Sequence, residues 1–368
     1  MSGKAPVFIQ GRGLVCALGA DLPAALECLR SGGVEPARPE TGPAWPCFAI
    51  ADADADWQAR AQRLVRQAVT QCGPLDHEAP LFIASCSLDI GALETLPEGI
   101  PPAHDCLRLP EAIAAWLDWR GPLFWFSTAC TSASAALLQA TEHLRGGHAT
   151  LVLEDCARRP NSRSDFSPTH QAAALRPAEA GPTLRPWRIL GRHFGPLPAD
   201  WRAQLAQRLG GRPRRLGEWA ELALFGALHC LEDAGESSLP AQARLRLSSI
   251  AGPTQALQTA LAEYRADGQP LPLGFLQSQP NQALAHLAKA LGWQGDACCL
   301  TSRETLASLR LVCQSGATEL LLGWVDEGGK RSDWLRLQAY EETDLPVLTD
   351  FAALADRQLT DFRLQDDL

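Results

Sequence analysis

The stretch RGPLFWFSTACTSASAALLQATEHLRGG, residues 120–147, carries the pattern on which the fold prediction rests. Leu123–Phe126 is a short run of bulky apolar residues, which is typical of a buried strand. Apolar residues then recur with helical spacing from Ala136 to Leu144, and Gly146-Gly147 ends the helix. Only small residues surround Cys130 between the two elements. The sequence therefore predicts a strand, a tight turn that carries a cysteine, and a helix.

Cys130 is a candidate nucleophile because of its place in this pattern. The unpaired N–H groups and the dipole at a helix N-terminus stabilise a thiolate and lower the pKa of a cysteine. The same N–H groups can hold a developing oxyanion, and small neighbours let a substrate carbonyl approach. These features predict acyl transfer through a thioester. The alternative is a buried, unreactive thiol, since free cysteines are among the most buried residues.

The two halves of the chain repeat one pattern. Val7 to Arg12 reads as a strand with a glycine turn and is followed by a helical segment, as are residues 187–211. Ile9-Gln10-Gly11-Arg12 parallels Ile189-Leu190-Gly191-Arg192. The later elements repeat in the same order, as helix 57–72 with 218–234, strand 81–93 with 247–257, helix 109–121 with 279–295, and strand 149–155 with 317–327.

This repetition predicts an α/β fold made of two similar units. The first unit is expected at 1–155 and the second at 187–330, with a polar connection over 156–186. Residues 331–368 are expected to form a C-terminal strand and a loosely held acidic tail. Strands that alternate with helices favour parallel or mixed sheets covered by helices, and two such units suggest pseudo-two-fold symmetry.

Composition excludes several functional classes. The net charge of −9 and the lack of a basic stripe argue against nucleic acid as a partner. No apolar run approaches the ~18 residues of a membrane span, and the N-terminus lacks the apolar core of a signal peptide. The twelve cysteines are scattered without metal-ligand spacing, so we expect reduced thiols, no metal and no cofactor. A cytoplasmic location is expected.

Residues 120–153, RGPLFWFSTACTSASAALLQATEHLRGGHATLVL, resemble the active-site region of β-ketoacyl synthases, the condensing enzymes of fatty-acid and polyketide assembly. Further pieces occur in family order, namely the first strand with its glycine turn, ASCSLDIGALETL (84–96) and LPEAIAAWLDWRGP (109–122). The resemblance implies a thiolase-like fold with two α/β halves layered α-β-α-β-α. It also implies that Cys130 accepts an acyl chain from an acyl carrier protein, with Phe126, Thr128 and Thr131 beside the substrate tunnel.

The second half departs from that family. Its usual members carry two catalytic histidines there, one in an HGTGT-like motif and one in a GH-containing loop, and neither motif occurs in this second half. Among the eight histidines, His170 and His193 are the candidate bases for Cys130. His77, His104, His143 and His148 are expected to be solvated, while His229 and His286 are expected in the interior.

The second copy of the turn can be aligned in two ways. Counting nine residues from Gly295, as from Gly121 to Cys130, reaches Glu304, whereas counting back from Gly316 reaches Cys299. We favour the first alignment. It makes DACCLT, residues 296–301, a buried strand with two core cysteines and makes Ser302 the helix N-cap.

These patterns lead to three functional hypotheses. The favoured one is a β-ketoacyl synthase-like subunit that pairs with an active ketosynthase, as chain-length factors do in type II polyketide systems such as those for aryl polyenes. The second is an active acyltransferase or ketosynthase that uses Cys130. The third is a non-catalytic scaffold that binds carrier proteins. The expected partners are an acyl carrier protein and a second subunit, in a heterodimer with a ketosynthase or in a homodimer.

Overall fold

The computed structural model describes residues 7–36, 48, 50, 56–85, 105–145, 150–155, 170–177, 185–211, 213, 215–267, 271–342 and 345–365. The chain forms two compact units. The first unit comprises Met1–Pro102, Leu107–Phe126 and Cys130–Pro182, and the second comprises Ala103–Cys106, Ser127–Ala129 and Thr183–Leu368.

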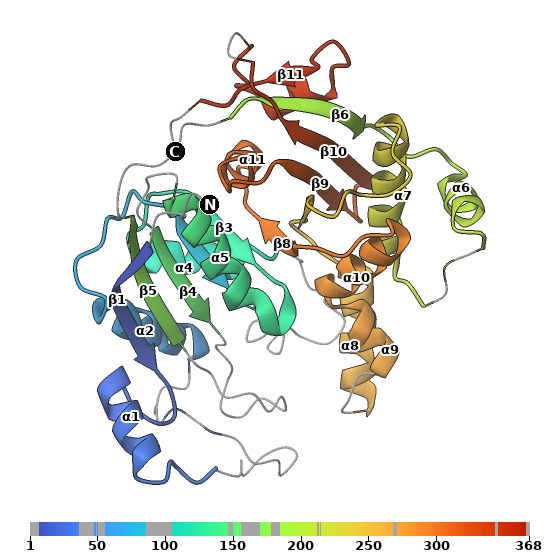
Figure 1. The fold of residues 1–368 in the computed structure, drawn as a ribbon. Coiled ribbons are helices and arrows are strands. Elements are labelled where there is room, and N and C mark those ends of the chain that lie inside the picture. Colours follow the sequence, from blue (N-terminus) through green and yellow to red (C-terminus); the bar gives the residue numbers. More distant parts are fainter. Residues whose placement is uncertain are drawn as a thin grey trace. The chain divides into compact units, whose positions relative to one another are not determined.

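The described residues of the first unit form five strands of a sheet, with helices packed against them (Figure 1). The strands are β1 Val7–Val15, β2 Leu81–Ala84, β3 Leu123–Phe126, β4 Thr150–Asp155 and β5 His170–Pro177. Their order is β1-β5-β4-β2-β3, with β2 parallel to β3 and β4, and β5 antiparallel to β1 and β4. The helices are α1 Leu22–Arg30, α2 Trp57–Thr70, α4 Arg108–Trp116 and α5 Ser132–Leu144, and the short 3-10 helix η1 spans Ala129–Thr131.

The second unit has the same plan with one strand added. Its strands are β6 Trp187–His193, β7 Arg244–Ser248, β8 Ala297–Thr301, β9 Glu319–Asp326, β10 Arg331–Ala339 and β11 Asp361–Phe362, in the order β8-β7-β9-β10-β6-β11. Its helices are α6 Trp201–Arg208, α7 Glu218–Asp233, α8 Thr254–Asp267, α9 Pro272–Gln277, α10 Pro280–Ala290 and α11 Thr305–Cys313, with the 3-10 helix η2 at Phe351–Ala355.

The sequence repeat is a structural repeat. In each unit the first strand lies beside the fifth, followed by the fourth, the second and the third. The first strands share a β-bulge at the same place, because the pairing register shifts between Ile9 and Gly11 in β1 and between Ile189 and Gly191 in β6. The predicted α/β fold with two similar halves is therefore confirmed.

A glycine allows the first strand of each unit to pack against the end of a helix. A Cβ added at Gly11 would lie 2.0 Å from the carbonyl oxygen of Cys72, just after α2. A Cβ added at Gly191 would lie 2.3 Å from the carbonyl oxygen of Cys230 in α7. No other residue fits at either site without moving the backbone of the helix.

The expected connection over 156–186 is wrong in part. Residues 170–177 form β5, which pairs with β1 along eight residue pairs and with β4 along six. This strand joins the edge strand of the first unit to the rest of its sheet. The remainder of that expected connection, up to residue 184, lies outside the described residues.

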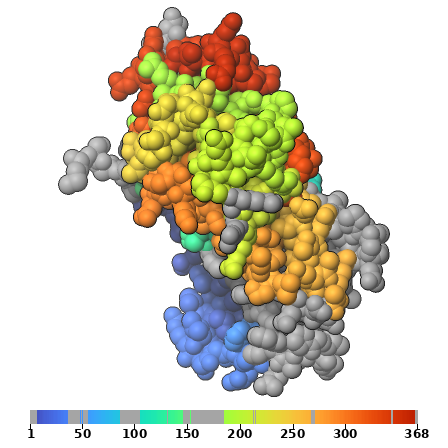
Figure 2. All heavy atoms as spheres, turned by 90° about the vertical axis from the view of Figure 1, so that its right-hand side faces the viewer, coloured from blue at the N-terminus to red at the C-terminus, as the bar shows by residue number. Residues whose placement is uncertain are grey.

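The prediction of a loosely held tail is also wrong for residues 345–365. Four apolar side chains of this C-terminal segment are at most 4% exposed, namely Leu348, Leu354, Phe362 and Leu364. Strand β11 pairs antiparallel with β6. In Figure 2, red atoms of the C-terminal region of the chain lie against light-green atoms of the second unit. The guanidinium of Arg192 donates hydrogen bonds to the carbonyls of Leu354, Asp356 and Leu359. The segment is thus an integral part of the second unit.

We expect Gly191→Ala to lower the free energy of unfolding of the second unit by about 1–3 kcal/mol, because the added methyl group overpacks the contact with α7. Urea denaturation monitored by tryptophan fluorescence measures this loss. Gly217→Ala is the matched control, since a Cβ there would meet atoms no closer than 3.8 Å. Equal stability of Gly191→Ala and the wild type would contradict the close approach.

Candidate functional site

Strand β3 provides a rigid base for the cysteine turn. Phe124 and Phe126 are fully buried, and Trp125 is only 4% exposed. The Phe82 ring on the neighbouring strand β2 lies 5.4 Å from the Phe124 ring and 5.8 Å from the Phe126 ring, measured between centroids. Because these rings fix the end of β3, they also fix the point at which the turn begins.

The backbone after β3 is strained at the residue before Cys130. Ala129 has a φ of 50°, in the left-handed region that residues with a Cβ seldom occupy. Such strain persists only where the surrounding structure enforces it, and it is concentrated at functional sites. The sequence held no sign of this feature, because the position carries alanine where glycine is the usual residue.

Cys130 follows this strained residue directly. It lies in the middle of η1, and α5 begins two residues later at Ser132. The predicted strand, turn and helix are therefore confirmed, and the backbone of Cys130 lies at the N-terminal end of α5. The first N–H groups of an α-helix have no partner within the helix and carry a partial positive charge. A thiolate or an oxyanion at this end of α5 would be stabilised by them. The side chain of Cys130 lies outside the described structure.

The predicted tunnel residues have different surroundings. Phe126 is fully buried and packs against Phe82. The hydroxyl oxygen of Thr128 accepts a hydrogen bond of 3.3 Å from the N–H of Cys299. Thr131 is exposed at the end of η1. Their place beside a substrate tunnel stays a prediction.

His193, one of the two candidate bases, is engaged within the second unit. Its Nδ1 lies 2.7 Å from the carbonyl oxygen of Ser332, so Nδ1 carries the proton and donates it to that hydrogen bond. The ring lies 5.5 Å from Phe225 and 5.4 Å from His229, measured between centroids. Burial lowers the pKa of His193 below its usual range. The role of His193 as a partner of Cys130 stays a prediction.

The other histidines separate into several environments. His170 begins β5, and its side chain lies outside the described structure, as do His104 and His148. His143 in α5 is fully buried near Phe82, so the expectation of a solvated ring is wrong. Burial lowers the pKa of His286 in α10, and Nδ1 of His77 lies 3.4 Å from the carbonyl oxygen of Asp118.

The second unit places no cysteine at its corresponding turn. Cys298 and Cys299 lie in β8 and are 2% and 6% exposed, and burial raises the pKa of both thiols. Helix α11 begins after Glu304, whose N–H donates to the hydroxyl oxygen of Ser302. The alignment with Glu304 at the turn is confirmed, although the N-cap is Glu304 and not Ser302.

Neither a membrane span nor a metal cluster is found in the part of the chain that the structure describes. None of its helices there has both the length and the apolar character needed to cross a bilayer. Within the same residues, no three histidine, cysteine or acidic side chains gather as metal ligands.

One protein family matches part of this chain. Residues 108–179, which include α4, β3, Cys130 and α5, match the family model of the β-ketoacyl synthase N-terminal domain. The resemblance expected from the sequence is therefore confirmed for this segment. No curated protein matches the chain.

Solved structures with low overall similarity include two ketosynthase complexes and one 3-oxoacyl-(acyl carrier protein) synthase III. A ketosynthase, ApeO, in complex with its chain length factor ApeC from Xenorhabdus doucetiae is 16% identical, with a TM-score of 0.35, over 91% of this chain and 98% of the other. A type II polyketide ketosynthase complex with acyl carrier protein, AntDE:AntF, is 12% identical, with a TM-score of 0.38, over 92% and 100%. The 3-oxoacyl-(acyl carrier protein) synthase III of Pseudomonas aeruginosa PAO1 is 14% identical, with a TM-score of 0.27, over 91% and 98%.

Ala129→Gly is expected to raise the free energy of unfolding by up to about 1 kcal/mol, because glycine adopts a positive φ without steric cost. Thermal or urea denaturation measures the change. The matched control, Ala135→Gly within α5, is expected to lose about 1 kcal/mol. Destabilisation of similar size in both variants would contradict a strained turn at Ala129.

We expect the protein to lose stability as the pH falls from about 6.5 toward 4, in part because of His229. Burial, with the charges of Arg208 and His193, lowers the pKa of His229 to about 4. The unfolded chain therefore binds the additional proton in this range, and acid favours unfolding. Urea denaturation at pH 7 and pH 5 is expected to show a smaller difference for His229→Gln than for the wild type. An unchanged difference would show that His229 does not contribute.

Proposed function

We propose that this chain, whose residues 108–179 match the β-ketoacyl synthase N-terminal domain, is a ketosynthase-like subunit that accepts an acyl chain on Cys130. The observation that carries the proposal is the turn itself. A buried strand ends at Phe126, and Ala129, three residues further on, has a positive φ. Cys130 follows directly, and α5 begins two residues after it. This arrangement places the backbone of Cys130 at the N-terminal end of α5. The free N–H groups there can stabilise both a thiolate and an oxyanion.

The proposed step is a thioester exchange. The Cys130 thiolate attacks the carbonyl carbon of an acyl thioester carried by an acyl carrier protein, and the carbonyl oxygen becomes an oxyanion. The bond to the carrier sulfur then breaks, and the carrier leaves as a thiol after taking up a proton. The acyl group remains on Cys130. Oxidants, metals and cofactors have no part in this exchange.

We propose further that the chain depends on a partner for carbon–carbon bond formation. Decarboxylation of a malonyl unit requires hydrogen-bond donors for the enolate, and the histidine motifs that supply them in ketosynthases do not occur in the second half. His193 is hydrogen-bonded to Ser332 and packed against Phe225, which supports this reading. The role proposed is that of a chain-length-factor-like partner of an active ketosynthase in fatty-acid or polyketide biosynthesis, with aryl polyene systems as the favoured setting.

Incubation with an acyl-acyl carrier protein, followed by mass spectrometry of the intact chain, tests the acylation. We expect a mass increase equal to one acyl group in the wild type and none in Cys130→Ser, because serine lacks the thiolate. The matched control is Cys28→Ser, which removes a partly exposed free thiol and is expected to keep the adduct. Acylation that persists in Cys130→Ser, or no acylation of the wild type, would refute the proposal.

Addition of malonyl-acyl carrier protein to the acylated chain tests the dependence on a partner. The chain alone is expected to retain its acyl group and to form no β-ketoacyl product. A β-ketoacyl product that requires Cys130 would instead identify an active ketosynthase with an unrecognised base.

A further inference from the structure

The first strand of the first unit presents an apolar edge. Strand β1 lies at the margin of its sheet, and no described strand pairs with its outer side (Figure 1). Phe8 is 59% exposed and Ile9 is 63% exposed. Unpaired edges that carry apolar side chains tend to pair with further polypeptide, and proteins usually shield them.

The corresponding edge of the second unit is covered. Ile189 in β6, which occupies the place of Ile9 beside the shared bulge, is only 8% exposed. Its N–H donates a hydrogen bond of 2.8 Å to the carbonyl of Thr360, and β11 continues the pairing along β6. The cover is residues 345–365 of the same chain. In the second unit, the group that covers this edge is therefore an extended polypeptide segment.

An arginine completes the comparison. Arg192 lies two residues beyond the bulge in β6, is 8% exposed, and donates to the carbonyls of Leu354, Asp356 and Leu359 in the covering segment. Arg12 has the same place in β1 but is exposed. In the part of the chain that the structure describes, no hydrogen bond or ion pair engages its guanidinium. The guanidinium N–H groups of Arg12 are thus exposed to solvent, whereas those of Arg192 donate hydrogen bonds to backbone carbonyls.

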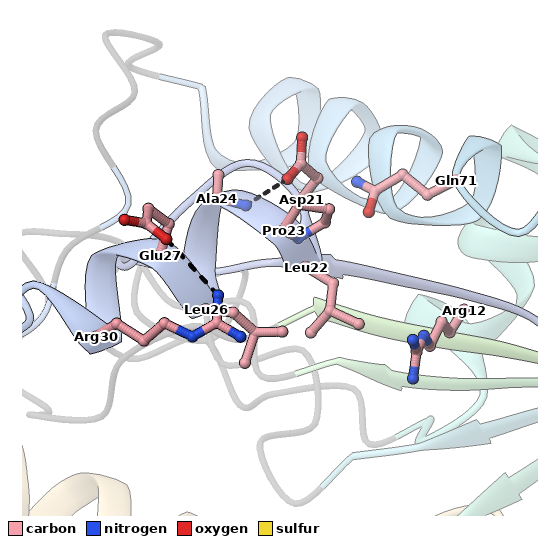
Figure 3. Close-up of a pocket in the computed structure, with 9 residues that line it drawn as sticks. All are labelled: Arg12, Asp21, Leu22, Pro23, Ala24, Leu26, Glu27, Arg30 and Gln71. Carbon is pink, nitrogen blue, oxygen red and sulfur yellow. Dashed lines mark hydrogen bonds and ion pairs between the residues drawn. The ribbon is translucent and has the colours of Figure 1, made fainter.

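Arg12 lines a groove between β1 and α1, and Figure 3 shows it across the groove from the residues of α1. The acidic residues of this groove are already engaged. Asp21 accepts a 2.8 Å hydrogen bond from the Ala24 N–H, and Glu27 pairs with Arg30 at 3.6 Å. Among the charged residues that line the groove, Arg12 has no partner within the described residues, so an occupant that supplies oxygen acceptors can bind it.

We propose that the outer edge of β1 and Arg12 bind an extended segment of a partner protein. The segment adds a short antiparallel strand to β1, as β11 does to β6, and places backbone carbonyls over Arg12. Its side chain opposite Phe8 is apolar. At the corresponding position of β6, Arg188 pairs with Asp361 at 2.9 Å, and Phe8 cannot make that pair. This site is separate from the acyl chemistry proposed for Cys130.

A peptide with the sequence of residues 345–365, LPVLTDFAALADRQLTDFRLQ, provides the probe, because it is the segment that covers β6. The peptide is labelled with fluorescein and prepared in its native form and as the variant D361L. The anisotropy of each labelled peptide is then measured as the full-length chain is added. D361L is expected to bind about tenfold more tightly than the native peptide, since leucine matches Phe8. Exchange of the peptide into the second unit would give the opposite order, because D361L loses the pair with Arg188.

Variants of the protein locate the binding. Arg12→Ala and Ile9→Asp are each expected to weaken binding of the D361L peptide about tenfold or more, through the lost charged hydrogen bonds and the lost apolar contact. The matched controls, Arg265→Ala and Leu271→Asp, change an arginine in α8 and a 58% exposed leucine of the second unit and are expected to leave binding unchanged. Circular dichroism confirms that each variant is folded. The proposal is overturned if D361L shows no saturable binding, if the native peptide binds more tightly, or if both β1 variants bind as the wild type does.

Discussion

The contact between a glycine and a helix carbonyl organises both units. Gly11 approaches Cys72, and Gly191 approaches Cys230, more closely than a side chain at either glycine would permit. Each contact holds the first strand of its unit against α2 or α7, the second helix along the chain from that strand. The β-bulge begins at the residue before the glycine. The bulge sets the direction of the next side chain, so Arg12 and Arg192 occupy the same place in their units. The packing of the first strand and the placing of the two arginines therefore both go with this close approach.

The same architecture gives the two turns different chemistry. In the first unit, strand β3 is followed by a turn with a strained alanine and a cysteine. In the second, β8 is followed by Ser302, Arg303 and Glu304, and its cysteines remain inside the strand. Burial in an apolar interior opposes thiolate formation at Cys298 and Cys299. The two similar units thus differ in that the turn of the first carries a candidate nucleophile, whereas the cysteines of the second are buried core residues.

The sequence predicted those parts of the fold that local pattern determines. Helical spacing and buried apolar runs gave the repeat, the strand before Cys130 and the alignment of Glu304. Strand β5 escaped prediction because HQAAALRP, residues 170–177, is rich in alanine and has no β-branched residue. The sequence did not predict the packing of residues 345–365, because the few buried apolar residues of this segment are separated by acidic and other polar residues. The strain at Ala129 depends on tertiary contacts, which no local pattern reports.

The covered edge of β6 has a consequence for folding. A chain with two similar halves contains two similar first strands, and its last strand must pair with only one of them. Arg188 attracts Asp361, whereas the same position in β1 holds Phe8 and would leave that carboxylate without a partner. This ion pair at the margin of the sheet therefore favours pairing of the last strand with β6 over pairing with β1. The difference between Phe8 and Arg188 thus disfavours pairing of the last strand with the first strand of the other repeat.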